Sequence, residues 1–284
     1  MFKSDSAKRK IGASKKILTE RPALLSIMNV SKSFEVGEQK VNVLKDISFS
    51  VRERDFLIIF GPSGCGKSTL LHTLLGLETP SSGKVVFMGR DLYKNTSEDD
   101  RTEIRKKHFG MVYQQSNWLK ALTVIENVAL PMILNGAGRI ESFQKAEKML
   151  KAVHMDQWAD YRPSELSSGQ QQRVSVARAL IGDPEIIIAD EPTGNLDFEA
   201  GRDMVHLLGD LNHIGKTIIM VTHDLEYLKS AKIIIEMLDG SIVGTYDEKD
   251  RERLLDNSLG YKKALMKNNK ALVKNRNKQY VQQK

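Results

Sequence analysis

Apolar and polar positions alternate in blocks along the chain, and each block predicts a strand or a helix. Alternation and β-branched residues predict strands at Leu24–Val30 and Val41–Val51, joined as an antiparallel hairpin by a turn at Gly37-Glu38. The continuous apolar run Phe56–Phe60 stops at a Gly-Pro pair, which is typical of a strand buried on both faces of a parallel sheet. Residues 67–77 then space their leucines as a helix does. The pattern therefore predicts a hairpin, then a strand, a glycine-rich loop and a helix.

Helical periodicity dominates the middle of the chain, over residues 124–179, with breaks at 135–138 and at Pro163. It predicts a block of helices inserted between strands. After the block, short apolar runs return with a helix between the first two, as in the β–α–β units of a parallel sheet. The elements predicted around the block are a helix at 101–109, strands at 111–113, 186–189 and 217–222, a helix at 201–211, and a hairpin of 233–237 with 242–245.

The net charge of +7 on 284 residues is unevenly distributed along the chain. Residues 1–22 carry +5 and residues 262–284 carry +8, so residues 23–261 carry −6. A nucleic-acid-binding domain concentrates positive charge on its folded body. The mildly acidic body therefore argues against nucleic acid as a partner.

Several features bear on the compartment. The longest apolar runs are far shorter than the roughly 20 residues that cross a bilayer, so no membrane span is expected. The first ten residues are polar and basic with no apolar segment behind them, so a cleaved secretory signal is not expected either. Cys65 is the single cysteine, which excludes an intrachain disulfide and fits a reducing compartment. Beyond Leu259 the composition is rich in Lys, Asn and Gln and predicts a loosely ordered tail.

A glycine-rich motif lies between the predicted strand 56–60 and the following helix. It fits G-x-x-x-x-G-K-[ST], in which close-folding glycines and a helix N-terminus present N–H groups to phosphate oxygens. We expect Lys67 to reach the β- and γ-phosphates, Ser68 to bind Mg²⁺, and Thr69 to lie near the α-phosphate. Cys65 is interpreted as a small residue that packs, in preference to a redox-sensitive thiol. The predicted phosphate-binding residues are Gly61, Pro62, Ser63, Gly64, Cys65, Gly66, Lys67, Ser68 and Thr69.

The predicted strand 186–189 ends in two carboxylates, Asp190 and Glu191. A strand buried on both faces tolerates acids only at its tip. Taken alone, Asp-Glu-Pro suits the start of a helix as well as a catalytic site. The phosphate loop upstream favours the catalytic interpretation, in which Asp190 holds Mg²⁺ and Glu191 orients or deprotonates the attacking water.

Four further motifs complete the set. Leu166–Arg173 contains Leu-Ser-Ser-Gly-Gln, and His223 stands in Val-Thr-His-Asp. Gln114 follows the strand predicted at 111–113, and Gly194–Asp197 is Gly-Asn-Leu-Asp. In this order they resemble the signature sequence, the switch histidine, the Q-loop glutamine and the D-loop of the ATP-binding cassette (ABC) ATPases. The resemblance covers about Leu24 to Thr245, nearly four-fifths of the chain.

The resemblance implies an α/β fold: a P-loop NTPase domain of ABC type with a RecA-like core, an N-terminal antiparallel β subdomain and an inserted α-helical subdomain. The implied division is a basic extension at 1–22, an ATPase domain at 23–246 with the helical insertion at about 116–180, and a C-terminal helix with a basic tail at 247–284.

The resemblance also implies how the residues work together. Two chains would sandwich two ATP molecules head to tail, so that each site takes its signature residues from the opposite chain. Glu191 and His223 would act in hydrolysis. Gln114 would contact the γ-phosphate and Mg²⁺ and link them to the helical insertion, where a helix of a partner docks. The implied nucleotide contacts beyond the phosphate loop are Phe34, Ser167, Ser168, Gly169, Gln170 and Asp197.

Two positions depart from the family pattern. Ser168 replaces the first glycine of the signature and adds a side chain where backbone would approach a γ-phosphate; we expect it to be accommodated. Phe34 stands where the family more often has a tyrosine that stacks on adenine. The phenyl ring keeps the stacking face, so adenine stacking should remain.

The segments 122–128, 162–166 and 190–197 resemble the MacB/LolD branch of macrolide-export and lipoprotein-releasing transporters. This implies an ATPase subunit at the cytoplasmic face of the cell membrane, energising a separate transmembrane permease, with ATP and Mg²⁺ as cofactors. One alternative is a regulatory ABC ATPase of a non-transporting membrane complex, as in cell division. Another is a soluble ABC ATPase that acts on ribosomes or DNA; such proteins usually pair two cassettes in one chain, whereas this chain has one phosphate loop.

Overall fold

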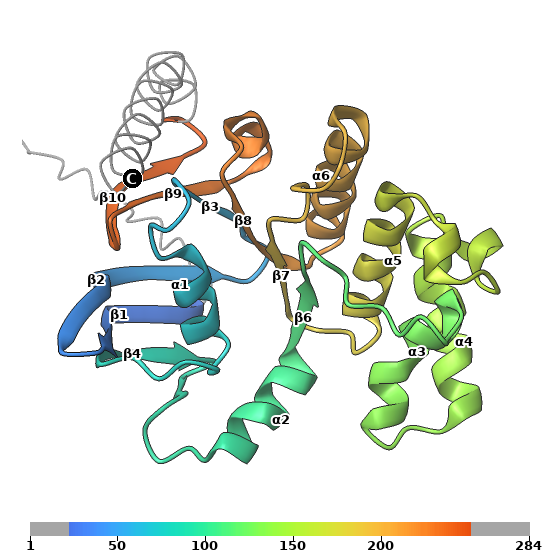
Figure 1. The fold of residues 1–284 in the computed structure, drawn as a ribbon, viewed down its shortest axis with the longest axis horizontal. Coiled ribbons are helices and arrows are strands. Elements are labelled where there is room, and N and C mark those ends of the chain that lie inside the picture. The colour runs from blue at the N-terminus through green and yellow to red at the C-terminus, as the bar shows by residue number, and fades with distance from the viewer. Residues whose placement is uncertain (1–22, 251–284) are drawn as a thin grey trace, which may run out of the picture.

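The computed structural model describes residues 23–250, which form two β-sheets with helices packed on them (Figure 1). The predictions for residues 1–22 and for the C-terminal helix and tail beyond residue 250 lie outside the described residues. The strands are β1 (Ala23–Val36), β2 (Gln39–Arg52), β3 (Phe56–Phe60), β4 (Ser82–Phe87), β5 (Arg90–Asp91), β6 (Phe109–Val112), β7 (Ile186–Asp190), β8 (Thr217–Thr222), β9 (Ile233–Leu238) and β10 (Ser241–Asp247). The helices are α1 (Lys67–Leu74), α2 (Glu98–His108), α3 (Val124–Leu134), α4 (Arg139–Ala152), α5 (Ser168–Leu180) and α6 (Phe198–His213), with short 3-10 helices η1 (Asp156–Trp158), η2 (Pro163–Glu165) and η3 (Leu225–Ser230).

The larger sheet has the strand order β10-β9-β3-β8-β7-β6, and the smaller one β2-β1-β4-β5. From β9 to β6 all neighbouring strands of the larger sheet are parallel, and only β10 pairs antiparallel, as the partner of β9 in a hairpin. The strands of the smaller sheet pair antiparallel. This arrangement confirms the α/β class and the N-terminal antiparallel β subdomain predicted from the sequence.

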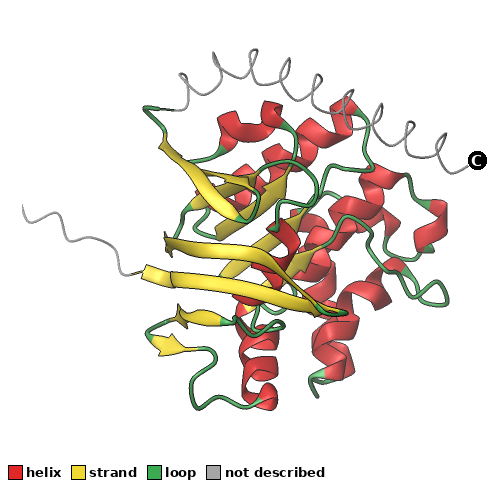
Figure 2. Cartoon of the chain, turned by 60° about the vertical axis from the view of Figure 1, so that its left-hand side comes forward, coloured by secondary structure: helices red, strands yellow, loops and turns green. Residues whose placement is uncertain are grey.

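The larger sheet is covered on both faces, which explains its continuous apolar strands. Phe56, Ile58 and Phe60 of β3 belong to a core shared with α5 and α6, whereas Leu57 and Ile59 belong to a second core shared with α1 and the smaller sheet. Successive side chains of a strand point to opposite faces, so every position of a doubly covered strand is apolar. Figure 2 shows the strands of both sheets on one side and most helices on the other. Within residues 23–250, no helix has both the length and the apolar character of a membrane span.

Several predicted elements differ from the observed ones at their ends. The hairpin at 24–30 and 41–51 is confirmed, but both strands are longer, and β4 and β5 were not predicted. The helix predicted at 67–77 ends at Leu74, because Gly76 turns the chain with a φ of 71°. The helix predicted at 101–109 begins earlier, at Glu98, where the Ser97 side chain caps it, and Phe109 joins β6.

We expect Gly110→Ala to destabilise the fold, because β6 lies directly against the last turn of α5. A Cβ at Gly110 would overlap the carbonyl oxygen of Ala179 and lie 2.9 Å from Cγ of Pro184. Overpacking of this kind costs about 1–3 kcal/mol. The matched control is Gly209→Ala in α6, where a Cβ meets nothing within 4 Å and should stabilise the helix slightly. Thermal unfolding followed by circular dichroism should show a lower Tm for Gly110→Ala alone; equal Tm values for the two variants would contradict the close contact.

Candidate functional site

Four of the predicted motifs meet at one edge of the larger sheet. In the parallel ladder, Phe60 of β3 pairs with Thr222 of β8, and Asp190 of β7 pairs with Val221, so these strands end together. The segments at and after these ends carry the phosphate loop, His223 and the Asp190-Glu191 pair, and β6 next to β7 leads to Gln114. In open α/β sheets, ligands bind beyond the carboxyl ends of the strands. This edge is therefore the candidate site.

The loop 61–69 leaves the start of α1 open for an anion. Gly66 caps α1 with a φ of 103°, and no side chain bonds the first N–H groups of the helix. These N–H groups and the helix dipole favour a phosphate at this position. Nζ of Lys67 donates to the carbonyl oxygens of Gly61 (2.8 Å) and Pro62 (3.1 Å), which holds the largely buried ammonium group over the loop.

The inner side of the loop is packed against the protein body, and its outer side is accessible. Cys65 is buried, and burial raises the pKa of its thiol, which keeps it protonated and agrees with the packing interpretation. A Cβ at Gly61 would lie 2.9 Å from Sγ of Cys65. Ser63, Gly64 and Ser68 are exposed, and Thr69 is half-buried, so these four of the predicted phosphate and Mg²⁺ contacts are accessible to solvent.

The two carboxylates at the end of β7 have different surroundings. Burial, and next the charge of Glu191, raise the pKa of Asp190, while the charges of His72 and Lys67 oppose this shift. Oε2 of Glu191 lies 2.7 Å from Nδ1 of His223, which brings together two side chains 32 residues apart in the sequence. Glu191 has a φ of 47°, a conformation rarely adopted by side-chain-bearing residues and often found at functional sites.

The alternative role of Asp190-Glu191-Pro192 as the start of a helix is wrong. Helix α6 begins only at Phe198, and Asp197 caps it by accepting a hydrogen bond of 2.8 Å from the N–H of Ala200. Asp190 ends β7, and Glu191 N–H donates to the Val221 carbonyl at 3.0 Å, which extends the ladder between β7 and β8. The pair thus belongs to the end of the sheet.

Gln114 contacts the segment 194–197, the predicted D-loop. A Cβ at Gly194 would lie 2.5 Å from Nε2 of Gln114, so the glutamine side chain packs closely against this glycine. Nδ2 of Asn195 donates to the Gln114 carbonyl at 3.2 Å. The structure therefore joins the Q-loop and the D-loop through both side-chain and main-chain groups.

The predicted signature residues lie at the start of α5, apart from the phosphate loop. Ser167 and Gln170 form a reciprocal cap: Ser167 N–H donates to Oε1 of Gln170 at 2.9 Å, and Gln170 N–H donates to Oγ of Ser167 at 3.3 Å. Ser168 is exposed, and Gly169 approaches Ala200 of α6. Figure 1 shows α5 and α1 on opposite sides of β7. One chain thus brings these residues close to α6, and not to its own phosphate loop.

Phe34 lies half-buried on β1 with a cation against its ring. Nζ of Lys32 is 4.8 Å from the ring centroid and forms an ion pair of 2.5 Å with Glu78. An ammonium group at this distance interacts favourably with the face of the ring. The ion pair holds Lys32 in place and helps to fix the orientation of Phe34.

Residues 23–250 contain no cluster of three or more His, Cys, Asp or Glu side chains able to hold a metal ion alone. Mg²⁺ in nucleotide sites is commonly held by one or two protein oxygens together with phosphate oxygens. Asp190 is suited to this role, because burial and the charge of Glu191 disfavour its ionised form, and a bound cation would stabilise that form. The exposed hydroxyl of Ser68 is the second protein oxygen that the sequence predicts.

Comparison with known proteins decides the family. A family model described as ABC transporter matches residues 44–194, more than half of the chain. The chain belongs to the ABC transporter family. It is an ATP-binding cassette ATPase close to the MacB and MJ0796 type. It is 45% identical over 220 residues to an uncharacterized ABC transporter ATP-binding protein of Methanocaldococcus jannaschii, an alignment that covers 78% of this chain and 98% of the relative.

Two further similarities place the cassette more finely. The chain is 45% identical over 220 residues to the macrolide export ATP-binding/permease protein MacB of Mannheimia succiniciproducens; the match covers 78% of this chain but 34% of that protein. The structure resembles the ATP-binding cassette MJ0796, solved as a dimer in a post-hydrolysis state bound to ADP and Pi. The TM-score is 0.72 at 36% identity, with 79% of this chain and 98% of that chain covered.

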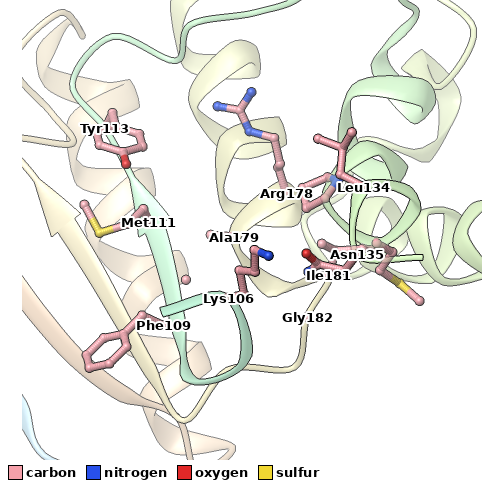
Figure 3. Close-up of a pocket in the computed structure, with 13 residues that line it drawn as sticks. Lys106, Phe109, Met111, Tyr113, Leu134, Asn135, Arg178, Ala179, Ile181 and Gly182 are labelled. Atoms are coloured by element: carbon pink, nitrogen blue, oxygen red, sulfur yellow. The ribbon is translucent and has the colours of Figure 1, made fainter. Parts of the chain in front are cut away.

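The cassette has a cleft beside the Q-loop, which the sequence did not predict. It has a volume of about 410 Å³ and lies between β6, the end of α3 and the end of α5. In Figure 3, Lys106 points toward Asn135 across this cleft, and Tyr113 and Arg178 border it. Tyr113 and Leu134 are exposed, Leu134 by 75%. The lining is largely apolar with two basic side chains.

Sequence reasoning also missed Gln172 and Arg178 on α5. Gln172 is 4% exposed and occupies the apolar face of the helix, together with Val176 and Ala179. A glutamine at a position where the periodicity calls for an apolar residue was the available signal. Trp118 packs against the core and donates from Nε1 to Oε1 of Gln171 at 3.1 Å.

Proposed function

We propose that this chain binds and hydrolyses Mg-ATP to energise a separate transmembrane permease of the MacB/LolD type, in export or lipoprotein release, at the cytoplasmic face of the membrane. One observation carries the proposal: the phosphate loop, Asp190, Glu191 and His223 converge at one edge of the sheet. The similarity to the ATPase part of MacB supports the choice of branch.

Each side chain has a role that its position allows. Lys67 and the N–H groups at the start of α1 bind the β- and γ-phosphates. Glu191, at 2.7 Å from His223, accepts the proton of the attacking water, and His223 contacts the γ-phosphate. Gln114 lies against the D-loop and contacts the γ-phosphate and the metal ion. Phe34 stacks on adenine.

Mg²⁺ is the metal that we assign to Asp190, Ser68 and Gln114. When bound, it neutralises charge on the phosphate oxygens during transfer. Asp190 supplies the carboxylate, and its raised pKa reflects a buried charge that a cation stabilises. Oxygen ligands of this kind suit Mg²⁺.

The separation of the signature residues from the phosphate loop supports a head-to-tail dimer. Ser167, Ser168, Gly169 and Gln170 lie at the start of α5 beside α6, and α5 lies on the opposite side of β7 from α1, which follows the phosphate loop. A second copy placed head to tail brings them to its nucleotide. Asp197, at the start of α6, lies on the same side and belongs to the same contact. The dimeric state of the related cassette MJ0796 supports this arrangement.

The cleft beside the Q-loop is the proposed docking site for a short cytoplasmic helix of the permease. Leu134 and Tyr113 offer apolar surface, and Arg178 has no carboxylate partner within residues 23–250. An amphipathic helix that presents apolar residues and one acidic side chain complements this lining. Tyr113 immediately precedes Gln114, so the docked helix would lie next to the γ-phosphate contact.

The test is affinity capture from detergent-solubilised membranes of the source cells. Glu191→Gln with ATP should capture a polytopic permease with a large extracytoplasmic domain. Adding Leu134→Asp should abolish this capture, because it places a charge in the cleft. Ile214→Asp is the matched control, since Ile214 is exposed by 78% at the far end of α6. Capture of ribosomal or DNA-bound proteins without a membrane protein would contradict the transporter role and leave the ATPase in place.

A further inference from the structure

The loop around Gln114 is hydrogen-bonded to helix α5 by the buried side-chain amide of Gln172. Nε2 of Gln172 donates to the Tyr113 carbonyl at 2.9 Å, and Oε1 accepts from Oγ of Ser116 at 3.3 Å. Gln172 and Ser116 are 4% and 8% exposed. Hydrogen bonds in such a place are costly to break, because the groups left behind have no water to bond.

Two more side chains of α5 hold the same loop. Arg178 donates to the Ser116 carbonyl, and its guanidinium lies 4.4 Å from the ring centroid of Trp118. Gln171 accepts from the Trp118 indole. Residues 113–118 are thus attached to one helix by main-chain and side-chain contacts, which makes loop and helix a single mechanical unit.

The loop 113–118 and helix α5 each carry residues that we place at a nucleotide. Gln114, within the loop, faces the nucleotide of its own chain under the proposed function. Ser167 and Ser168, at the start of α5, face the nucleotide of the other chain. Gln172 lies only four and five residues further along the helix, about 6–8 Å at 1.5 Å per residue. A shift of the loop on nucleotide binding therefore reaches the signature serines through little more than one turn of helix.

We propose that Gln172 is a positioning residue that couples the two nucleotide sites of the dimer. When ATP contacts Gln114, the loop 113–118, which is hydrogen-bonded to α5, orients this helix so that Ser167 and Ser168 contact the nucleotide of the other chain. Occupancy of one site thereby promotes closure of the other. This inference rests on the dimer of the proposed function.

The test compares Gln172→Met with the wild-type full chain. Methionine matches glutamine in length and lacks both hydrogen-bonding groups. ATP hydrolysis measured against ATP concentration should show a Hill coefficient reduced toward 1 and a lower kcat, because the coupling of ATP affinities between sites, usually about 5- to 150-fold, is lost. Binding of a fluorescent ATP analogue to the dilute, monomeric chain should stay within about twofold of wild type, because Gln172 contacts no nucleotide.

Control variants separate coupling from folding. Gln144→Met, on the exposed surface of α4, should leave both the Hill coefficient and kcat unchanged. Ser116→Ala removes the hydrogen bond from Ser116 to Gln172 and keeps the one from Gln172 to Tyr113, so it should give an intermediate loss of cooperativity. If circular dichroism shows that Gln172→Met is unfolded, Ser116→Ala becomes the variant that tests the coupling. Unchanged cooperativity in a folded variant would overturn the coupling role. A loss of nucleotide affinity in the monomer as large as the loss of kcat would also overturn it. A wild-type chain without ATP-dependent dimers would instead overturn the proposed dimer.

Discussion

Glu191→Gln should lower kcat for ATP hydrolysis by about 100-fold or more. The carboxylate is the proposed proton acceptor for the attacking water, and a positioned general base contributes about 10²- to 10⁴-fold. Glutamine keeps the size of the side chain and its contact with His223, at 2.7 Å in the structure, but accepts protons poorly. ATP binding should persist, so the dimer should accumulate. Phosphate release measures the rate, and analytical ultracentrifugation with ATP measures the dimer.

The matched control is Glu147→Gln. Glu147 is an exposed acid of α4 that pairs with Lys151 at 2.8 Å, and surface pairs of this kind contribute little to stability. This variant should hydrolyse ATP at the wild-type rate and show no extra dimer. Wild-type hydrolysis by Glu191→Gln would contradict the role of Glu191 as the base and leave His223 as the next candidate.

Lys67→Met should weaken ATP binding by about 100-fold, corresponding to the loss of charge-assisted hydrogen bonds worth about 1.5–3 kcal/mol each. The ammonium group is held over the loop by the carbonyls of Gly61 and Pro62, at 2.8 and 3.1 Å, close to where the helix start binds phosphate. Methionine has a similar length but carries no charge. Isothermal titration calorimetry with ATP measures the change in Kd.

Lys94→Met is the control for lost positive charge, because Lys94 is exposed and lies after β5, outside the site. It should change the Kd for ATP by less than about twofold, since exposed charges are screened by salt. Each variant is compared with its own Tm without nucleotide, and ATP should raise the Tm of Lys94→Met but not that of Lys67→Met. A Kd for Lys67→Met within threefold of wild type would contradict the phosphate contact.

Local sequence predicted the features that depend on neighbouring residues. The phosphate loop follows a buried strand and precedes a helix in the chain itself, so its motif and setting were both visible. The ends of elements were less certain, because they depend on caps and turns such as Ser97 before α2 and Gly76 after α1. β4 was missed, because its stability comes from antiparallel pairing with β1, more than 50 residues earlier.

The sequence by itself determined the α/β class and predicted the residues of the nucleotide site, because these predictions follow from short motifs and from apolar periodicity. Tertiary structure alone decided which of them meet. Parallel pairing of β7 with β8 brings Glu191 to His223, and the fastening of Tyr113 by Gln172 spans 59 residues. The partners in contacts of this kind depend on strand order and helix packing, and the periodicity of the chain does not identify them.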